Sequence, residues 1–221
     1  MKKTIFFGLA AASLTFASAA VEAATITTLP FWNGSTAISA WGGNATHTYG
    51  EVLTAPGSSL TSFTFEVNDG GSPANYVAQV YAWSGSTTTG GPVGAALYTG
   101  AASILPGFSG FQAVTTNTGG VAVTPGQRYS ILLFDGSGDG VRGNWGRIAA
   151  HPGVVGDVGF FFNNGPSNAN GTFNDFGSLA YSATFTNSVP EPTSWALMLM
   201  GFGSIGAAAR SGRRKQAAVA V

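Results

Sequence analysis

The chain has 221 residues, 33 glycines and equal numbers of basic and acidic side chains. It has no cysteine, which excludes disulfides, catalytic thiols, thiolate metal sites and iron–sulfur clusters. Between residues 24 and 189, seven acidic side chains against three arginines give a net charge of −4, and a surface without basic clusters does not suit nucleic acid or anionic lipid.

Residues 1–23 have the order of parts found in a secretory signal peptide. Two lysines form the positive start, residues 5–12 form the apolar centre, and small residues lead up to Ala23. We expect cleavage after Ala23, with Ala20 as the alternative site. A permanent N-terminal anchor is the other interpretation, but the apolar run is short and is interrupted by small and polar residues. The sequence therefore predicts export through the secretion translocase.

Residues 24–186 are predicted to form one all-β domain. Their glycine, serine, threonine and asparagine residues are mixed with aromatic and β-branched residues, which is typical of strands and turns. We find no convincing helical stripe in this segment. In chain order the predicted strands are 25–31, 51–54, 60–67, 76–83, 95–98, 111–115, 127–135, 143–149, 158–163 and 179–186.

Two of these runs alternate in the way that a half-buried strand requires. The alternation places on one face Phe63, Phe65 and Val67 in the first run, and Leu179, Tyr181, Ala183 and Phe185 in the second. Turn signals separate the runs, among them Pro56-Gly57, Gly90-Gly91-Pro92 and Pro125-Gly126. Eight to ten short strands in one domain indicate two packed antiparallel sheets, that is, a jelly-roll-like β-sandwich.

Three segments follow the predicted domain. The linker, residues 187–194, contains Pro190-Glu191-Pro192, whose prolines hold the backbone extended. Residues 195–209 carry no charge, and a helix of this length would span roughly 22 Å, which is short for a hydrocarbon core about 30 Å thick. The tail, residues 210–221, begins with a basic cluster that would stay in the cytoplasm. That cluster consists of Arg210, Arg213, Arg214 and Lys215.

The same segment allows two interpretations, a plain single-pass anchor or a temporary anchor that a membrane peptidase removes. It resembles the PEP-CTERM sorting domain, and the resemblance spans residues 189–215. The residues that carry it are Pro190, Glu191, Pro192, Trp195, Gly201, Phe202, Gly203, Gly206 and the arginines. The resemblance implies that a membrane exosortase recognises the Pro-Glu-Pro triplet and releases or transfers the protein from the inner membrane towards the cell surface. Such proteins typically come from bacteria that make extracellular polysaccharide.

Other catalytic or binding motifs are incomplete. Residues 201–206 have the spacing of a dinucleotide-binding loop, but they follow no strand and lack a downstream acidic residue. We interpret the small residues Gly203 and Ala207 as a packing surface for another membrane helix. His47 and His151 lack the spacing of a zinc protease and are expected in loops or at the surface. All seven carboxylates of the domain are expected at turns and at the surface, so no glycosidase pair is assigned.

Two features of the sequence could form a ligand site. Asp135, Ser137 and Asp139 alternate after a predicted strand, with glycine at the sixth position, as in a calcium loop. The twelfth position is Gly146 instead of a bidentate glutamate, so we favour a hairpin loop without metal. The domain's tryptophans could stack on sugar rings, although core packing is their commoner role. They are Trp32, Trp41, Trp83 and Trp145.

The sequence thus predicts a non-enzymatic surface or matrix protein that is retained with extracellular polysaccharide. One alternative is a glycan-binding module with an aromatic platform, and another is an extracellular hydrolase. No cofactor is predicted apart from the calcium candidate. The expected partners are the translocase, the exosortase, the inner membrane for a short time, and exopolysaccharide, but not nucleic acid.

Overall fold

In the computed structural model the described residues are 23–41, 46–68, 70, 73–85, 90–107, 109–135, 146–152, 159–163, 172–174, 177–187 and 199–203. The chain divides into two compact units, one spanning residues 22–188 and the other made of residues 1–21 and 189–221. The first unit holds all the strands of the described segments. In the second unit the described residues are 199–203, and these are helical.

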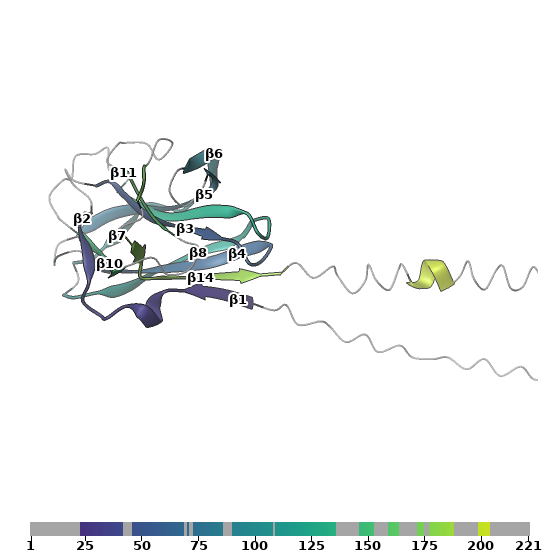
Figure 1. Ribbon diagram of the computed structural model, residues 1–221, viewed down its shortest axis with the longest axis horizontal. Helices are drawn as coiled ribbons and strands as arrows, with labels where there is room; N and C mark the ends of the chain where they lie inside the picture. The colour runs from purple at the N-terminus through teal and green to yellow at the C-terminus, as the bar shows by residue number, and fades with distance from the viewer. Residues whose placement is uncertain are drawn as a thin grey trace, which may run out of the picture. The chain divides into compact units, whose positions relative to one another are not determined.

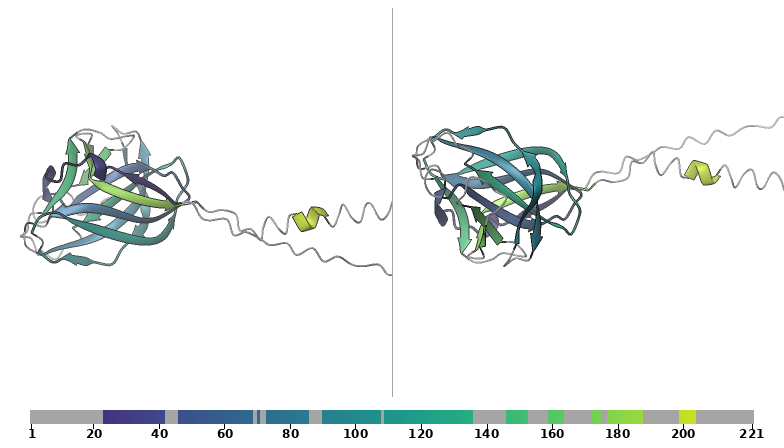
Figure 2. Two further views of the ribbon diagram at one scale, coloured as in Figure 1. Left: turned by 90° about the horizontal axis from the view of Figure 1, so that it is seen from below. Right: turned by 90° about the horizontal axis from the view of Figure 1, so that it is seen from above.

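The first unit is a sandwich of two antiparallel sheets, shown packed face to face in Figures 1 and 2. The first sheet has seven described strands: β1 (Ala23–Thr27), β2 (Ala37–Trp41), β4 (Ser59–Asn68), β8 (Gln112–Ala122), β10 (Gly146–Pro152), β13 (Gly177–Leu179) and β14 (Tyr181–Thr186). In this sheet β4 lies between β14 and β8, and β1 pairs with the other side of β14.

The second sheet also has seven described strands. They are β3 (Thr48–Thr54), β5 (Ala74–Gly85), β6 (Gly90–Thr99), β7 (Ser103–Leu105), β9 (Arg128–Phe134), β11 (Gly159–Asn163) and β12 (Thr172–Asn174). Their order is β12-β11-β3-β9-β5-β6, and β7 pairs with the first residues of β5. Because the chain passes repeatedly from one sheet to the other, the architecture is the predicted jelly-roll-like β-sandwich.

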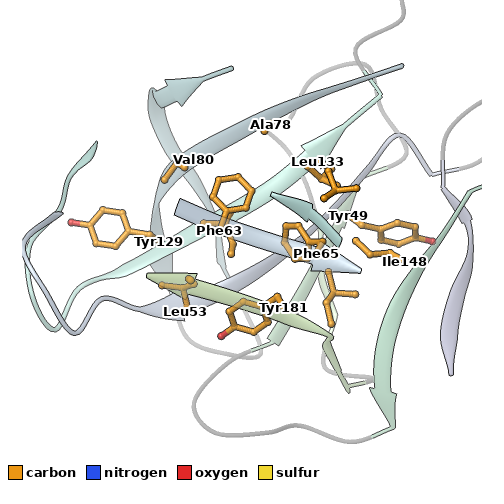
Figure 3. Packing of buried hydrophobic residues seen from close by; sticks show 14 of the residues in the cluster. Tyr49, Leu53, Phe63, Phe65, Ala78, Val80, Tyr129, Leu133, Ile148 and Tyr181 are labelled. Atoms are coloured by element: carbon orange, nitrogen blue, oxygen red, sulfur yellow. The ribbon is translucent and has the colours of Figure 1, made fainter. Parts of the chain in front are cut away.

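The core lies between the two sheets and is built by strand alternation. On β4, Phe63, Phe65 and Val67 all point inward and are at most 1% exposed, as their spacing predicts. Facing residues of the second sheet, among them Val80 and Leu133, close the layer, and Figure 3 shows these side chains pointing towards one another. With no disulfide available, this aromatic and aliphatic layer is the main source of stability.

Each predicted strand overlaps an observed one, but three predictions need correction. The run 25–31 is not one strand, because β1 ends at Thr27 and a 3₁₀ helix, η1 (Leu29–Phe31), follows with a proline in its first turn. The run 179–186 is broken at Ala180, whose N–H donates to the Ala149 carbonyl (2.8 Å), so Leu179 belongs to β13. Strands β2, β7 and β12 lie outside the predicted runs.

The third correction concerns Gly90-Gly91-Pro92, which belongs to strand β6 and not to a turn. Gly90 pairs with Gly85, and Pro92 pairs with Trp83. A Cβ atom on Gly90 would lie 2.5 Å from the Ser84 carbonyl oxygen and 2.7 Å from the Trp83 indole nitrogen. The glycine therefore permits close packing of two strands, which is a different use of glycine from a positive φ in a turn.

Candidate functional site

The predicted sorting segment is described only in part. Pro190-Glu191-Pro192, Trp195, Gly206 and the basic cluster lie outside the described residues. Residues 199–203 form a short helix, and within it Leu199, Met200 and Phe202 are 62–72% exposed. Exposed apolar side chains are what the predicted membrane segment requires, and the membrane contact itself stays a prediction.

A helix of sufficient length and hydropathy to cross a membrane does not occur among the described residues. The predicted membrane segment, residues 195–209, extends beyond the described helix on both sides. Its membrane role and the packing role of Gly203 and Ala207 therefore remain predictions.

The sandwich ends immediately before this segment. The first residue of β1, Ala23, is the register partner of Thr186, the last residue of β14. The two strands are antiparallel neighbours, so the predicted signal peptide and the predicted linker attach to the same end of the sandwich (Figure 1).

Among the described carboxyl groups of the sandwich, that of Glu51 on β3 is fully buried. Its Oε2 atom accepts a hydrogen bond from the Leu179 N–H (2.9 Å), so this side chain joins the second sheet to the first. Burial raises the pKa of Glu51 well above its ordinary value of 4.5, and hydrogen bonds from the Leu179 N–H and the Ser178 side chain offset only part of that rise. The carboxyl group therefore stays protonated at pH values where an exposed glutamate is ionised.

The Tyr181 hydroxyl on β14 is another buried polar group of this interior. Among the described residues, neither the Oε1 atom of Glu51 nor the Tyr181 hydroxyl has a hydrogen-bond partner. Burial, and then the charge that Glu51 would carry, raise the pKa of Tyr181. Burial thus favours the neutral form of both groups, because an unpaired charge in this layer would cost far more than a neutral polar atom.

A cavity of 230 Å³ lies beside this group, between β2, β10, β11 and β13. Ser178 and His151 are register partners and both line it. Phe31, which is 56% exposed, packs edge-on against the His151 ring with 6.1 Å between centroids. A Ser-His-Glu triad would need the carboxylate to orient the histidine. Here the Glu51 carboxyl group accepts hydrogen bonds from the Leu179 N–H and the Ser178 side chain, and burial raises its pKa, an arrangement that differs from such a triad.

A second cavity, of 240 Å³, lies where β5, β6 and β7 of the second sheet face β8 of the first. Its aromatic lining consists of Tyr76 and Tyr98, both half-buried, and the Tyr98 hydroxyl donates to the Asn117 carbonyl (3.2 Å). Hydroxyl and amide side chains and small residues complete the lining. These are Ala78, Gly100, Ala101, Ser103, Thr115, Thr116 and Asn117.

The expected surface location of the carboxylates and histidines is only partly correct. Glu51 is fully buried, and Asp135 is 7% exposed at the end of β9. The Asp135 N–H donates to the His47 carbonyl (2.7 Å), and its Oδ2 atom lies 4.0 Å from Nδ1 of His47. His151 lies within strand β10, half-buried, instead of in a loop. Glu51 is buried because its position on β3 points it inward. Asp135 is buried because the end of β9 lies against the chain at His47.

Of the three residues predicted to bind calcium, Asp135 is described, whereas Ser137 and Asp139 fall outside the described residues. Within the described stretches, no three histidine or acidic side chains come together in a way that could hold a metal ion. Calcium binding by this loop therefore stays a prediction.

The tryptophans do not form an exposed platform where they are described. Trp83 is 7% exposed and packs with Val52 and Leu132 in a small cluster separate from the main core. The Trp32 indole N–H donates to the Thr36 carbonyl (2.7 Å), and its ring packs edge-on against Phe111 at 5.1 Å. The side chains of Trp41 and Trp145 lie outside the description. The aromatic residues that do line a polar cavity are tyrosines, which the sequence did not single out.

Comparisons with known proteins identify the C-terminal segment. Residues 188–215 match the model of the PEP-CTERM protein-sorting motif. No curated protein matches the chain. One similar solved structure is a clostridial cysteine protease, Cwp84, after propeptide cleavage, with 14% identity and a TM-score of 0.48 over 75% of this chain and 40% of that one.

Another contains the cysteine protease and lectin-like domains of Cwp84, a surface layer associated protein of Clostridium difficile. It shares 14% identity, with a TM-score of 0.41 over 65% of this chain and 32% of that one. The chain thus spans less than half the length of these structures, and at such scores the likeness supports no statement about activity or ligand. The firm identification is that of the C-terminal segment: the chain carries a PEP-CTERM protein-sorting motif at residues 188–215, the kind of signal through which an exosortase sorts exported proteins towards the cell surface.

Proposed function

We propose that this chain is a non-enzymatic surface or matrix protein that is retained with extracellular polysaccharide once its sorting segment has been removed. The observation that carries the proposal is the position of the sorting motif, which begins at residue 188, two residues after β14 ends at Thr186. No room is left between the motif and the sandwich for a further domain. The sandwich is therefore the cargo that sorting delivers, and function after sorting belongs to it.

The interior of the sandwich supports a structural role more than a catalytic one. The buried carboxyl group of Glu51 bonds backbone and hydroxyl groups of β13, and burial keeps it protonated. A glycosidase needs two carboxyl groups that face each other across an open cleft. Of the carboxylates in the described segments, Glu51 and Asp135 are buried and Glu66 is half-buried on β4, on three separate strands or strand ends.

The charge and exposed chemistry of the domain suit a neutral, hydrated polymer. Residues 24–189 carry no lysine and few charges of either sign. Such a surface gains little from ionic attraction, so attachment to a matrix would depend on hydrogen bonds and on apolar contacts. The polar cavity lined by Tyr76 and Tyr98 supports the further alternative that the domain binds glycan directly.

Retention can be tested in the producing bacterium with two matched strains, one of them unable to make exopolysaccharide. The wild-type protein should be found with the cell surface and matrix in the first strain and free in the medium in the second. A variant with alanines in place of Pro190-Glu191-Pro192 should stay in the membrane fraction of both strains. Equal retention of the wild-type protein in the two strains would contradict a matrix role.

A further inference from the structure

We propose that the cavity between β5, β6, β7 and β8, called the edge cavity below, binds a single neutral sugar ring. This inference rests on the proposed function, because it names the part of the sandwich that would hold the polysaccharide. The steps of the argument are the position of the cavity, the small residues that keep it open, the chemistry of its lining, and its size.

The edge cavity lies at an open side of the sandwich. In the described part of the chain β8 pairs only with β4, and β6 pairs only with β5, so each is an edge strand of its sheet. The Tyr98 hydroxyl spans the gap between these two edges by donating to the Asn117 carbonyl. Ala101, Thr115 and Asn117 are exposed and also line the cavity, so it opens to the surface.

Small residues keep the cavity open. Ala78 lies two residues after Tyr76 on the same inward face of β5, and Gly100 donates its N–H to the Ala78 carbonyl (2.8 Å). A Cβ atom on Gly100 would lie 3.2 Å from the Tyr98 hydroxyl oxygen. A side chain at Gly100 would therefore press on Tyr98, and a larger side chain at Ala78 would enter the cavity that Ala78 lines. A purely structural role does not require this opening.

The lining is aromatic on one side and polar on the other. Tyr76 and Tyr98 pack against the main core, so their rings are held in place by the buried layer. A fixed aromatic face suits the C–H side of a pyranose, and hydroxyl and amide groups suit its hydroxyls. The polar side is supplied by Ser103, by the inward-facing Thr116 and by the Asn117 carbonyl, whereas the Thr115 hydroxyl bonds the Thr64 hydroxyl (2.9 Å) on the other face of β8.

Existing hydrogen bonds leave this polar side able to accept. The Ser103 hydroxyl donates to the Ala101 carbonyl (3.2 Å), and the Tyr98 hydroxyl donates to the Asn117 carbonyl. A hydroxyl that has donated its hydrogen still offers acceptor lone pairs. The Thr116 hydroxyl, on the inward face of β8, can both donate and accept. The cavity therefore matches a ligand whose polar groups are hydroxyls, each of them both donor and acceptor.

The charge of the lining decides between neutral and acidic sugars. None of the residues that line the edge cavity is charged. A uronic acid, a phosphate or a sulfate would need a cationic partner or an array of N–H donors to replace its lost hydration. A neutral sugar needs neither.

The cavity volume of 240 Å³ is smaller than the roughly 300–1,000 Å³ of pockets that hold drug-sized ligands. The cavity is thus suited to one ring, at a chain end or a side branch, and each contact is weak. A polymer that repeats the same ring keeps the local ring concentration high, so a protein that dissociates from one ring can rebind a neighbouring one.

The test measures binding of mature protein to immobilised exopolysaccharide from the producing strain, by interferometry over a range of protein concentrations. Tyr76→Ala should weaken apparent affinity at least tenfold. The double variant Thr116→Val with Ser103→Ala keeps the aromatic wall, removes the two cavity hydroxyls, and should weaken it at least threefold. Tyr81→Ala is the matched control, because Tyr81 lies on the same strand but points to the opposite face, and its affinity should stay within twofold of wild type.

Circular dichroism and melting temperature identify any variant that does not fold, and the double variant keeps the test decisive if Tyr76→Ala fails. Binding should survive 1 M NaCl, because a neutral ligand has no ionic attraction to screen. Unchanged affinity in the folded cavity variants, or binding lost at high salt, would overturn the edge cavity as a neutral-sugar site. Either result would leave the proposed function standing if retention in cells still required exopolysaccharide, whereas retention without exopolysaccharide would contradict the proposed function itself.

Discussion

Replacing Glu51 with glutamine should stabilise the sandwich at neutral pH and have little effect in acid. The Glu51 carboxyl group is fully buried, and burial raises its pKa well above 4.5 in the folded chain. In the unfolded chain the same group ionises near its ordinary value. Below pH 4.5 both states are protonated, so the group then carries no pH-dependent penalty. As the pH rises above 4.5, the unfolded state loses its proton first, and the folded state becomes less stable relative to it.

The size of this effect follows from proton linkage. One proton retained by the folded state alone costs about 1.4 kcal/mol of unfolding free energy for each pH unit, until the folded carboxyl group also ionises. For a domain of this size, about 1 kcal/mol shifts the melting temperature by roughly 2–4 °C, so each pH unit should lower it by about 3–6 °C. Glutamine has the same shape, keeps an acceptor for the Leu179 N–H and does not ionise, so the variant should lose this slope.

Melting curves of wild type and Glu51→Gln between pH 4 and pH 8 measure the difference. Glu66 also has a raised pKa because of partial burial, but it is present in both proteins and its contribution cancels. Glu66→Gln serves as the control and should change the pH profile less. A difference between wild type and Glu51→Gln that stays constant over the whole pH range would refute the reasoning, because it would mean that Glu51 titrates alike in both states.

Three further predictions concern packing and metal binding. Phe65→Ala should lower the unfolding free energy by about 3–5 kcal/mol in urea titrations, because Phe65 is fully buried, whereas Phe31→Ala, at a 56% exposed ring, should cost less than about 1 kcal/mol. Gly90→Ala should destabilise by about 1–3 kcal/mol, because its Cβ would meet the Ser84 carbonyl at 2.5 Å, and Gly91→Ala, which meets nothing within 4 Å, should be nearly neutral; equal effects at the two glycines would argue against the close-packing account. Calcium should leave the melting temperature unchanged, and a rise that Asp139→Ala abolishes would show that Asp135, Ser137 and Asp139 form a metal loop after all.

The core strands could be predicted because their pattern is local. In β4 the period of two that puts Phe63, Phe65 and Val67 on one face is visible in eight consecutive residues, and the structure buries all three. The same period of two also indicates that Glu51 is buried. Tyr49, Glu51 and Leu53 alternate along β3, so the glutamate had to share the inward face of its two buried neighbours.

The edge cavity could not be predicted in the same way. Tyr76 and Tyr98 lie on adjacent strands of one sheet, but Thr116 and Asn117 belong to the other sheet. Which two edges face each other depends on the packing of the whole sandwich, and strand periodicity carries no information about it. The prediction of a turn at Gly90-Gly91-Pro92 was wrong for a related reason. A turn and a closely packed edge strand can have the same sequence, and only the neighbouring Trp83 distinguishes them.

The central claim is that the sandwich is delivered by removal of the C-terminal segment. The two prolines of Pro190-Glu191-Pro192 hold the backbone extended, which is the shape that proteases usually bind, and the apolar run after it is short for a permanent anchor. Alanines at all three positions should leave an uncleaved form in the inner membrane with its sandwich still folded. Alanines at Thr193 and Ser194 are the control and should be processed normally.

Intact-mass spectrometry of protein taken from the cell surface tests this claim most directly. The account predicts the mass of a chain that begins near Ala24 and lacks everything from about Pro192 onward. Surface protein whose mass still includes Arg213, Arg214 and Lys215 would contradict processing and would favour a plain membrane anchor.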